Sequence, residues 1–211
     1  MVSFCKRIKI YSCYFSVFVI CLFLFVDKTT AQQKNDSVFN TVIISKIALT
    51  DAEAGNNFYL NETKNVERFM LLVFLSPECP LCKNYSPVLN NLYQEYSKRV
   101  NIYGVIPGKA YSVNDVKKFK QEYDLPFPLL IDNNKKLTQY LQATVTPQVI
   151  LLNDDYRLLY KGAIDNRLQS LGKQRINPTA FYLNDALQEC LSNKKISVKR
   201  TKAVGCIIND Y

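Results

Sequence analysis

The stretch Leu71–Cys82, LLVFLSPECPLC, places a continuous run of apolar residues directly before two cysteines. An apolar run of this length predicts a buried strand that is covered on both faces. Pro80 follows Cys79 and suits the first position of a helix, where its missing N–H costs nothing. The stretch therefore predicts a strand, a short loop and a helix, with Cys79 at the helix N-terminus and Cys82 one turn inside.

This position has a chemical consequence for Cys79. The N-terminus of a helix carries partial positive charge and free N–H groups, which favour a thiolate. Two cysteines in the spacing Cys-x-x-Cys at such a place indicate a redox dithiol, whereas a zinc half-site or two packed core cysteines are the plainer alternatives. We expect the Cys79 sulfur to be partly exposed and Cys82 to be buried behind it.

Composition narrows the chemistry that the chain can perform. Its 211 residues suffice for one domain with appendages, and the formal net charge is +9. No dense basic block with interleaved aromatic residues is present, so nucleic acid is not an expected partner. The chain has no histidine, which removes imidazole as metal ligand, proton shuttle or catalytic base. Chemistry must therefore rest on thiols, carboxylates, amines or tyrosines.

The first 31 residues have the pattern of a secretory signal peptide. A basic start is followed by the apolar run Ile10–Val26 and by the small residues Thr29-Thr30-Ala31 before a polar stretch. An uncleaved membrane anchor is the alternative, because the apolar run is long for a signal peptide. We therefore expect an exported protein of the periplasm or cell envelope, where disulfides persist, with contact to the membrane only if the segment stays uncleaved.

The remaining chain divides into a linker or strand over 32–44, a domain over 45–192 and a tail over 193–211. Within the domain, strand and helix patterns alternate and predict an α/β fold, with a polar surface insertion over 165–177. The expected strands are Phe69–Leu75, Val100–Ile106, Phe127–Ile131, Gln148–Leu152 and Tyr156–Ala163, preceded by a hairpin of Ile47–Leu49 and Phe58–Leu60; the expected helices are 80–98, 112–123, 135–141 and 178–191.

This order of elements resembles the thioredoxin superfamily, and within it the secreted redoxin or TlpA-like branch of AhpC/TSA type. The matching residues are Cys79-Pro80-Leu81-Cys82, Pro87 five residues later, and Thr146-Pro147 before an apolar strand. The resemblance implies a three-layer α/β/α fold with a mixed central sheet and an N-terminal β-hairpin extension around Asp51–Asn57. It also implies a thioredoxin-like protein-disulfide oxidoreductase that needs no cofactor.

Roles for individual residues follow from the same resemblance. Cys79 would attack a substrate disulfide and Cys82 would resolve the mixed disulfide. Pro147 would be cis and lie beside the dithiol, where backbone groups of Thr146 hold an extended substrate. Glu78 and Pro80 flank the first cysteine and would also meet the substrate.

The sequence departs from the family pattern at several positions. Glu78 stands where an aromatic residue is common, and Tyr85 stands where several members carry a glutamate that accepts a proton from the buried thiol. Peroxidase-type redoxins carry proline and threonine at the places of Leu72 and Ser76, so we do not expect direct reduction of peroxides.

The expected function is thiol–disulfide exchange with disulfide-containing exported proteins. An electron-donor thiol protein would supply the electrons. Pro80 removes one N–H that could stabilise a thiolate and no histidine can help, so the chain is expected to act as a reductant. One alternative is a Cu(I)-binding module that uses Cys79, Cys82 and Cys206, since soft thiolates suit this ion. Another is a thioredoxin-like module without catalysis.

Two further cysteines lie outside the Cys-x-x-Cys pair. Cys190 falls on the apolar face of the last expected helix, which indicates core packing. Cys206 lies in the apolar segment Ala203–Ile208, and a chain end of this kind should dock on the domain. Three placements stay open for Cys206: a third thiol beside Cys79 and Cys82, a buried core position, or a bridge to Cys190.

Overall fold

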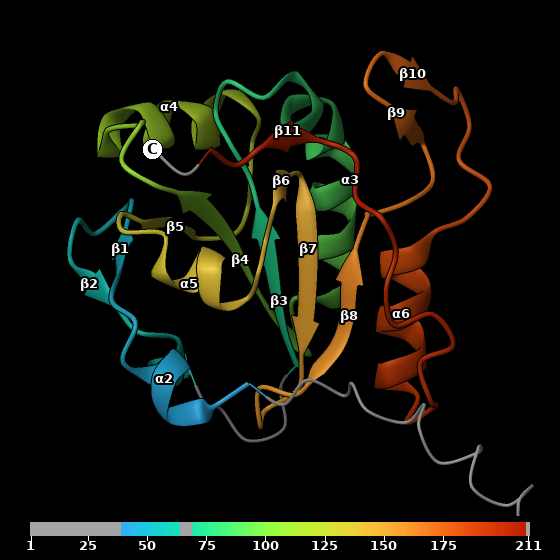
Figure 1. Ribbon diagram of the computed structural model, residues 1–211, viewed down its shortest axis with the longest axis horizontal. Helices are drawn as coiled ribbons and strands as arrows, with labels where there is room; N and C mark the ends of the chain where they lie inside the picture. The colour runs from blue at the N-terminus through green and yellow to red at the C-terminus, as the bar shows by residue number, and fades with distance from the viewer. Residues whose placement is uncertain (1–38, 64–68, 210–211) are drawn as a thin grey trace, which may run out of the picture. The chain divides into compact units, whose positions relative to one another are not determined.

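The computed structural model describes residues 39–63 and 69–209, and its centre is a seven-stranded sheet (Figure 1). Strand β3 is parallel to β4, and β4 is parallel to β5, whereas the other neighbours are antiparallel. The mixed sheet expected from the sequence is therefore confirmed. In spatial order its strands are β2 (Asn57–Phe58), β1 (Leu49–Asp51), β5 (Leu129–Asp132), β4 (Val100–Pro107), β3 (Phe69–Phe74), β7 (Gln148–Leu152) and β8 (Leu158–Gly162).

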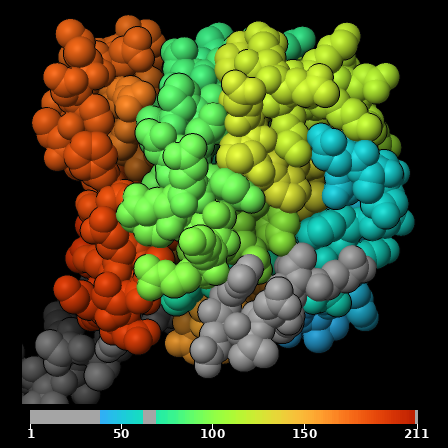
Figure 2. Space-filling model, turned by 180° about the vertical axis from the view of Figure 1, so that it is seen from behind, coloured from blue at the N-terminus to red at the C-terminus, as the bar shows by residue number. Residues whose placement is uncertain are grey.

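Helices cover both faces of this sheet. Successive side chains of a strand point to opposite faces, so Leu71 and Val73 join one hydrophobic cluster while Leu72 and Phe74 join the other. The first cluster includes residues of α3 (Pro80–Tyr96), α4 (Val113–Glu122) and α6 (Tyr182–Leu191), and the second includes residues of α2 (Thr41–Ser45) and α5 (Lys136–Tyr140). Figure 2 shows α3 running over the middle of the first face. The three-layer α/β/α arrangement is confirmed.

Local sequence signals account for where the helices begin. Pro80 occupies the first turn of α3. The Ser112 side chain accepts a hydrogen bond from the Asp115 N–H, and the Asp115 carboxylate accepts one from the Ser112 N–H. This reciprocal cap satisfies two N–H groups that the helix itself leaves free, and it fixes the start of α4 at the expected residue.

The N-terminal part of the domain differs from the expectation in detail. Strands β1 and β2 pair antiparallel with Leu49 opposite Phe58, but β1 also pairs with β5 and so continues the main sheet. The chain then turns into a short 3₁₀ helix, η1 (Leu60–Thr63), which ends the second strand earlier than expected. Where a linker or strand was expected over 32–44, Asn40 caps the helix α2 by accepting from two backbone N–H groups.

The signal peptide expected over residues 1–31 lies outside the described residues, as does the alternative of a membrane anchor. Across residues 39–63 and 69–209, no helix combines the length and the apolar character that crossing a membrane requires.

The segment 165–177 forms a small ribbon of two strands, β9 (Leu168–Ser170) and β10 (Lys173–Gln174). Most of its residues are exposed, and it projects beside α6 (Figures 1 and 2). Its first residue, Asp165, is the exception, because only 3% of its surface is exposed. The insertion is therefore a surface feature that begins with a buried carboxylate.

The tail returns along the free edge of β8 instead of leaving the domain (Figure 1). The Lys161 N–H donates to the Lys199 carbonyl at 3.0 Å, and the Thr201 N–H donates to the Lys161 carbonyl at 3.1 Å. The Thr201 hydroxyl accepts from the Ala163 N–H at 2.9 Å. Gly162 faces this contact, where a Cβ would collide with Thr201. These contacts fix the direction in which the last residues of the chain run.

Replacing Cys190 by alanine should lower the free energy of unfolding by about 1 kcal/mol, since it removes one buried sulfur. Cys190 is buried among the apolar residues of α6, and its thiol donates to the Leu187 carbonyl at 3.3 Å. Urea unfolding of the variant measures the loss. Rapid alkylation of Cys190 in the native protein would contradict this packing role.

Candidate active site

Cys79, the first cysteine of the Cys-x-x-Cys pair, lies between the end of β3 and the start of α3. Cys79 is the N-cap residue of α3, and its N–H donates to the Ser76 carbonyl at 3.1 Å. The Cys82 N–H donates to the Cys79 carbonyl at 3.0 Å, so the two cysteines are one helical turn apart. The structure therefore has the strand, loop and helix that the apolar run and Pro80 predict.

Cys82 lies behind Cys79 in the first core cluster. Burial raises the pKa of its thiol to about 11, and hydrogen bonds from the Ser76 backbone and the Thr146 side chain offset only part of this effect. The Ser76 N–H points at the Cys82 sulfur from 3.4 Å. At neutral pH, Cys82 is therefore a protonated thiol and a weak nucleophile until its proton is removed.

The peptide bond between Thr146 and Pro147 is cis, as expected from the sequence. Thr146 ends β6 (Val145–Thr146), and its carbonyl oxygen lies 3.2 Å from the Cys79 sulfur. Because this sulfur is in a disulfide and carries no proton, the contact is a close approach rather than a hydrogen bond. The structure thus brings Thr146 and the Cys-x-x-Cys pair together from segments 67 residues apart.

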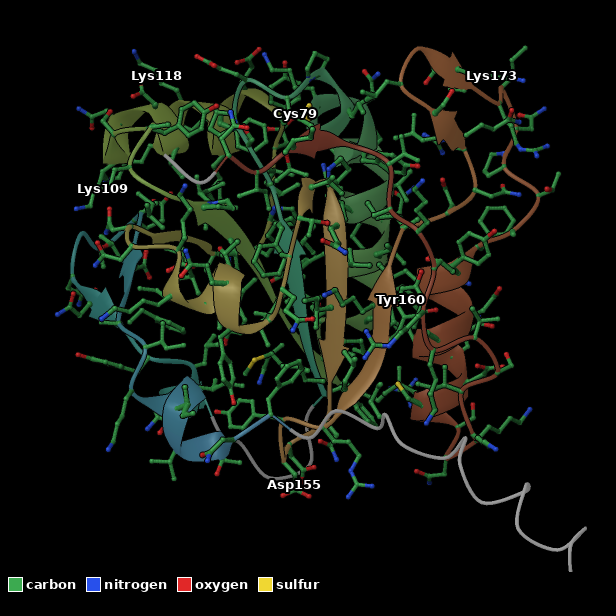
Figure 3. All side chains as sticks on the ribbon, viewed as in Figure 1. Cys79, Lys109, Lys118, Asp155, Tyr160 and Lys173 are labelled. Atoms are coloured by element: carbon green, nitrogen blue, oxygen red, sulfur yellow. A yellow bond between two sulfur atoms is a disulfide. The ribbon has the colours of Figure 1, made fainter. Side chains whose placement is uncertain are left out.

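The partner of Cys79 in this disulfide is Cys206, with a Cα–Cα distance of 6.1 Å. Cys206 belongs to β11 (Cys206–Ile207), which pairs antiparallel with β6, and Figure 3 shows Cys79 beside this strand. Thr146 is opposite Cys206 in the register. Of the three placements left open for Cys206, the structure has the one beside Cys79.

The expectation that Cys79 is partly exposed is wrong for this state, because only 2% of its surface is exposed. The sequence around Cys79 predicts an accessible helix start, and the cover comes instead from a segment 127 residues later. Cys82 and Cys190 are both free and buried, so no bridge joins Cys206 to Cys190.

Glu78 and Pro80 are exposed on either side of Cys79. The Tyr111 hydroxyl lies 2.9 Å from the Ser76 hydroxyl and 3.5 Å from a Glu78 carboxylate oxygen. Glu78 therefore faces solvent and Tyr111, and its contact with a substrate, like that of Pro80, stays a prediction. Tyr111 is a residue of this surface that the sequence did not single out.

An open pocket of about 220 Å³ lies beside the disulfide, between β11 and the loop after β4. Tyr111, Lys109 and Lys135 contribute to its wall together with Cys206 and Thr146. The Lys135 ammonium donates to the carbonyl of Asn209 in the tail. The surface next to the sulfurs is thus part apolar, with Ile207 and Ile208, and carries the positive charge of two lysines.

A second buried polar group lies further along α3. The Tyr85 hydroxyl donates to Asp165 at 2.5 Å, and Asp165 also forms an ion pair with Arg167 at 3.5 Å. Burial and the neighbouring Asp165 raise the pKa of Tyr85 far above its usual value. Tyr85 therefore keeps its proton and cannot replace the glutamate that accepts a proton in relatives. No local pattern in the polar stretch after Ile164 reveals that Asp165 is buried.

The Cu(I) hypothesis requires Cys79, Cys82 and Cys206 as three thiolates. Two of them are joined in a disulfide, which leaves Cys82 as the free thiol at this site. Within the described part of the chain, no group of three or more histidine, cysteine, aspartate or glutamate side chains is arranged to hold a metal ion. Nothing in this geometry favours a copper carrier.

Comparisons with known proteins agree with this geometry. The model of the AhpC/TSA family matches residues 43–164. The chain is 24% identical to the thiol-disulfide oxidoreductase ResA of Bacillus subtilis over 132 residues, which cover 58% of this chain and 73% of that protein.

Two solved structures are similar in fold, each with 23% sequence identity. An uncharacterized conserved protein from Geobacillus kaustophilus superposes with a TM-score of 0.70 over 84% of this chain and 94% of its own. The thioredoxin domain of a thiol-disulfide oxidoreductase from Bacteroides vulgatus superposes with a TM-score of 0.50 over 61% of this chain and 87% of its own.

The alkylation rate of Cys82 should rise with pH well beyond the range of an ordinary cysteine. Because its pKa is raised from 9.0 to about 11, the thiolate fraction should grow about tenfold per pH unit from about pH 7 to about pH 10. Iodoacetamide labelling of a Cys79→Ala, Cys190→Ala, Cys206→Ala variant, in which Cys82 has no neighbouring disulfide to attack, followed by mass spectrometry of the peptide that carries Cys82, measures this rate. A plateau near pH 8 would contradict the buried, protonated thiol.

Proposed function

The chain belongs to the AhpC/TSA family, in the TlpA-like redoxin branch of the thioredoxin superfamily, and is a thioredoxin-like thiol–disulfide oxidoreductase; on this premise we propose that it exchanges disulfides with other exported proteins through Cys79 and Cys82. One observation carries the proposal. Cys79, at the start of α3, forms a disulfide, and its sulfur lies next to the carbonyl oxygen of Thr146. The free thiol of Cys82 lies one helical turn further along α3.

The reaction begins with the reduced site. The Cys79 thiolate attacks one sulfur of a substrate disulfide, and the other substrate sulfur leaves as a thiolate that takes up a proton. Cys82 then loses its proton and attacks the Cys79 sulfur, which releases the second substrate thiol. The substrate has gained two electrons and two protons, and the chain ends with a Cys79–Cys82 disulfide.

Two features support the proposal that the Cys79–Cys82 pair donates electrons to its substrates. Pro80 supplies no N–H at the helix start, so fewer donors stabilise a Cys79 thiolate than in a helix without proline. Burial raises the pKa of Cys82, so its thiolate is also poorly stabilised. When the thiolate of a dithiol is poorly stabilised, its reduced form is less stable relative to the disulfide. Such a dithiol gives up its electrons more readily than that of a strongly oxidising protein.

The partners follow from the chemistry of the site. We place the protein in the periplasm or cell envelope, where the pattern of residues 1–31 would direct it and where a disulfide such as Cys79–Cys206 persists. Disulfide-containing exported proteins are the substrates, and an electron-donor thiol protein returns Cys79 and Cys82 to the reduced state. Thr146 with Pro147 holds the substrate segment, and Glu78 and Pro80 border it.

Peroxide reduction is not part of this proposal. Leu72 and Ser76 occupy the places of the proline and threonine of peroxidase-type redoxins. Leu72 is fully buried in the second core cluster, so its side chain offers nothing to a peroxide bound at Cys79.

The purified chain should reduce insulin disulfides when dithiothreitol is present as electron donor. Cys79→Ser should lower the rate by about 100-fold or more, because it removes the attacking thiolate. Cys82→Ser combined with Cys206→Ser removes both thiols that can displace a partner from Cys79, and it should instead accumulate mixed disulfides with envelope proteins, which a non-reducing gel resolves.

Cys190→Ser is the matched control for these variants, since it also replaces a buried cysteine but lies on α6. Its rate should equal that of the unaltered chain. Insulin reduction by Cys79→Ser equal to that of the unaltered chain, or no trapped partner with the Cys82→Ser, Cys206→Ser double variant, would refute the exchange reaction.

A further inference from the structure

We propose that Cys206 is a third redox cysteine of this site, and that the segment carrying it occupies the place of a substrate strand. The Cys79–Cys206 disulfide is then an internal counterpart of the mixed disulfide with substrate, and Cys82 resolves it. This inference rests on the proposed function, because it assigns a further step to the same two cysteines.

The backbone of the tail binds where an extended substrate would. Cys206 pairs with Thr146 and Ile207 with Val145, and the Ile208 N–H donates to the Thr144 carbonyl at 3.0 Å. Adding a strand to an exposed sheet edge is a general way for a protein to bind an extended peptide. The tail therefore uses the backbone groups next to the cis proline that a partner segment would need.

Gly205 makes the close approach of this strand possible. A Cβ at position 205 would collide with the carbonyl group of Thr146, which belongs to the backbone and cannot turn away. The residue before Cys206 must therefore be glycine for the strand to dock in this register. Gly205 thus fits sterically against Thr146, and Cys206 is bonded covalently to Cys79.

Contacts on both sides of Cys206 hold the segment in place. Upstream, the Thr201 hydroxyl lies 2.5 Å from the Tyr160 hydroxyl and accepts from the Ala163 N–H. Downstream, Lys135 donates to the Asn209 carbonyl. The strand itself is only two residues long, and 74% of the Ile207 surface is exposed. The part around Cys206 thus depends on its anchors and on the disulfide more than on apolar burial.

The position of Cys82 distinguishes this disulfide from a purely structural bridge. Cys82 follows Cys79 by one helical turn and keeps a free thiol. When Cys82 loses its proton and attacks the Cys79 sulfur, a Cys79–Cys82 bond forms and the Cys79–Cys206 bond breaks. Cys206 leaves as a thiolate and takes up a proton, so the exchange needs no external oxidant or reductant.

The two disulfide forms differ in access to the site. With Cys79–Cys206 formed, the strand covers Cys79, which is almost fully buried. With Cys79–Cys82 formed, the covalent link is gone, and a partner strand competes for Thr146 only with the backbone pairing and the anchors of the tail. Because burial raises the pKa of Cys82, the exchange is slow at neutral pH and accelerates as pH rises.

Disulfide mapping of the reduced full chain after oxidation tests the pairing. Oxidised glutathione converts two thiols into a disulfide and becomes two molecules of reduced glutathione. After an acid quench and alkylation, peptides linked through Cys79 and Cys206 should dominate for the unaltered chain and for Cys82→Ser. Cys206→Ser should give the Cys79–Cys82 link instead.

A pair of glycine variants tests the docking of the strand. Gly205→Ala should lower the ratio of the Cys79–Cys206 link to the Cys79–Cys82 link roughly tenfold or more, because its Cβ overpacks against Thr146. Gly172→Ala is the control for a glycine substitution away from the site. A Cβ there meets no atom within 4 Å, and the strain from its positive φ of 78° falls on the β9–β10 ribbon, so the ratio should stay unchanged. Equal ratios in the two variants would overturn the fitted strand.

A pH jump tests the role of Cys82. The Cys79–Cys206 form is prepared at low pH and then brought to about pH 9 with a maleimide present. A larger fraction of Cys82 is ionised at this higher pH. The unaltered chain should acquire label on Cys206 together with a Cys79–Cys82 link, and Cys82→Ser should not. Absence of Cys206 label in both proteins would show a static bridge and overturn the proposal.

The insulin assay separates this inference from the proposed function. Insulin reduction without any Cys79–Cys206 link or release of Cys206 would leave the exchange activity standing and refute the third cysteine. Release of Cys206 that depends on Cys82, without insulin reduction, would support the third redox cysteine and refute the proposed exchange with substrate proteins.

Discussion

The residue on which the arrangement of sulfurs depends is Thr146. Its carbonyl oxygen approaches the Cys79 sulfur, its side chain hydrogen-bonds the Cys82 thiol, and its backbone pairs with Cys206. A short strand ending in a cis peptide bond thus contacts all three cysteines, although it comes from a different part of the chain. Any shift of this strand would change the surroundings of each sulfur at once.

Burial distinguishes Cys82 from Cys206. Cys82 is enclosed by the core that the central strand and α3 build together, and its proton is held tightly as a result. Cys206 is half-buried, on a strand of two residues at the surface. The raised pKa keeps Cys82 protonated at neutral pH, which suits the role of resolving cysteine that we propose for it.

Features that a local pattern determines were predictable from the sequence. The apolar run before Cys79 and the proline after it led to the central strand and the helix, whereas the cis bond at Pro147 was implied by the resemblance to the thioredoxin superfamily. The cover over Cys79 was not predictable, because spacing favours Cys82 as its partner and the choice of Cys206 depends on how the tail runs along the edge of β8. Asp165 was missed for a similar reason, since the partner of its buried carboxylate is the hydroxyl of Tyr85, which lies 80 residues earlier in the chain.

The anchor at Thr201 has a kinetic consequence. Cys206 follows this fixed residue by only five positions, so its thiol stays tethered close to Cys79 even when no bond joins them. Short tethers of this kind give effective concentrations on the order of millimolar. A thiol from solution or from a partner must therefore compete with the tethered thiol of Cys206 for the sulfur of Cys79. Only a partner that binds the site, and so reaches a comparable local concentration, can displace Cys206.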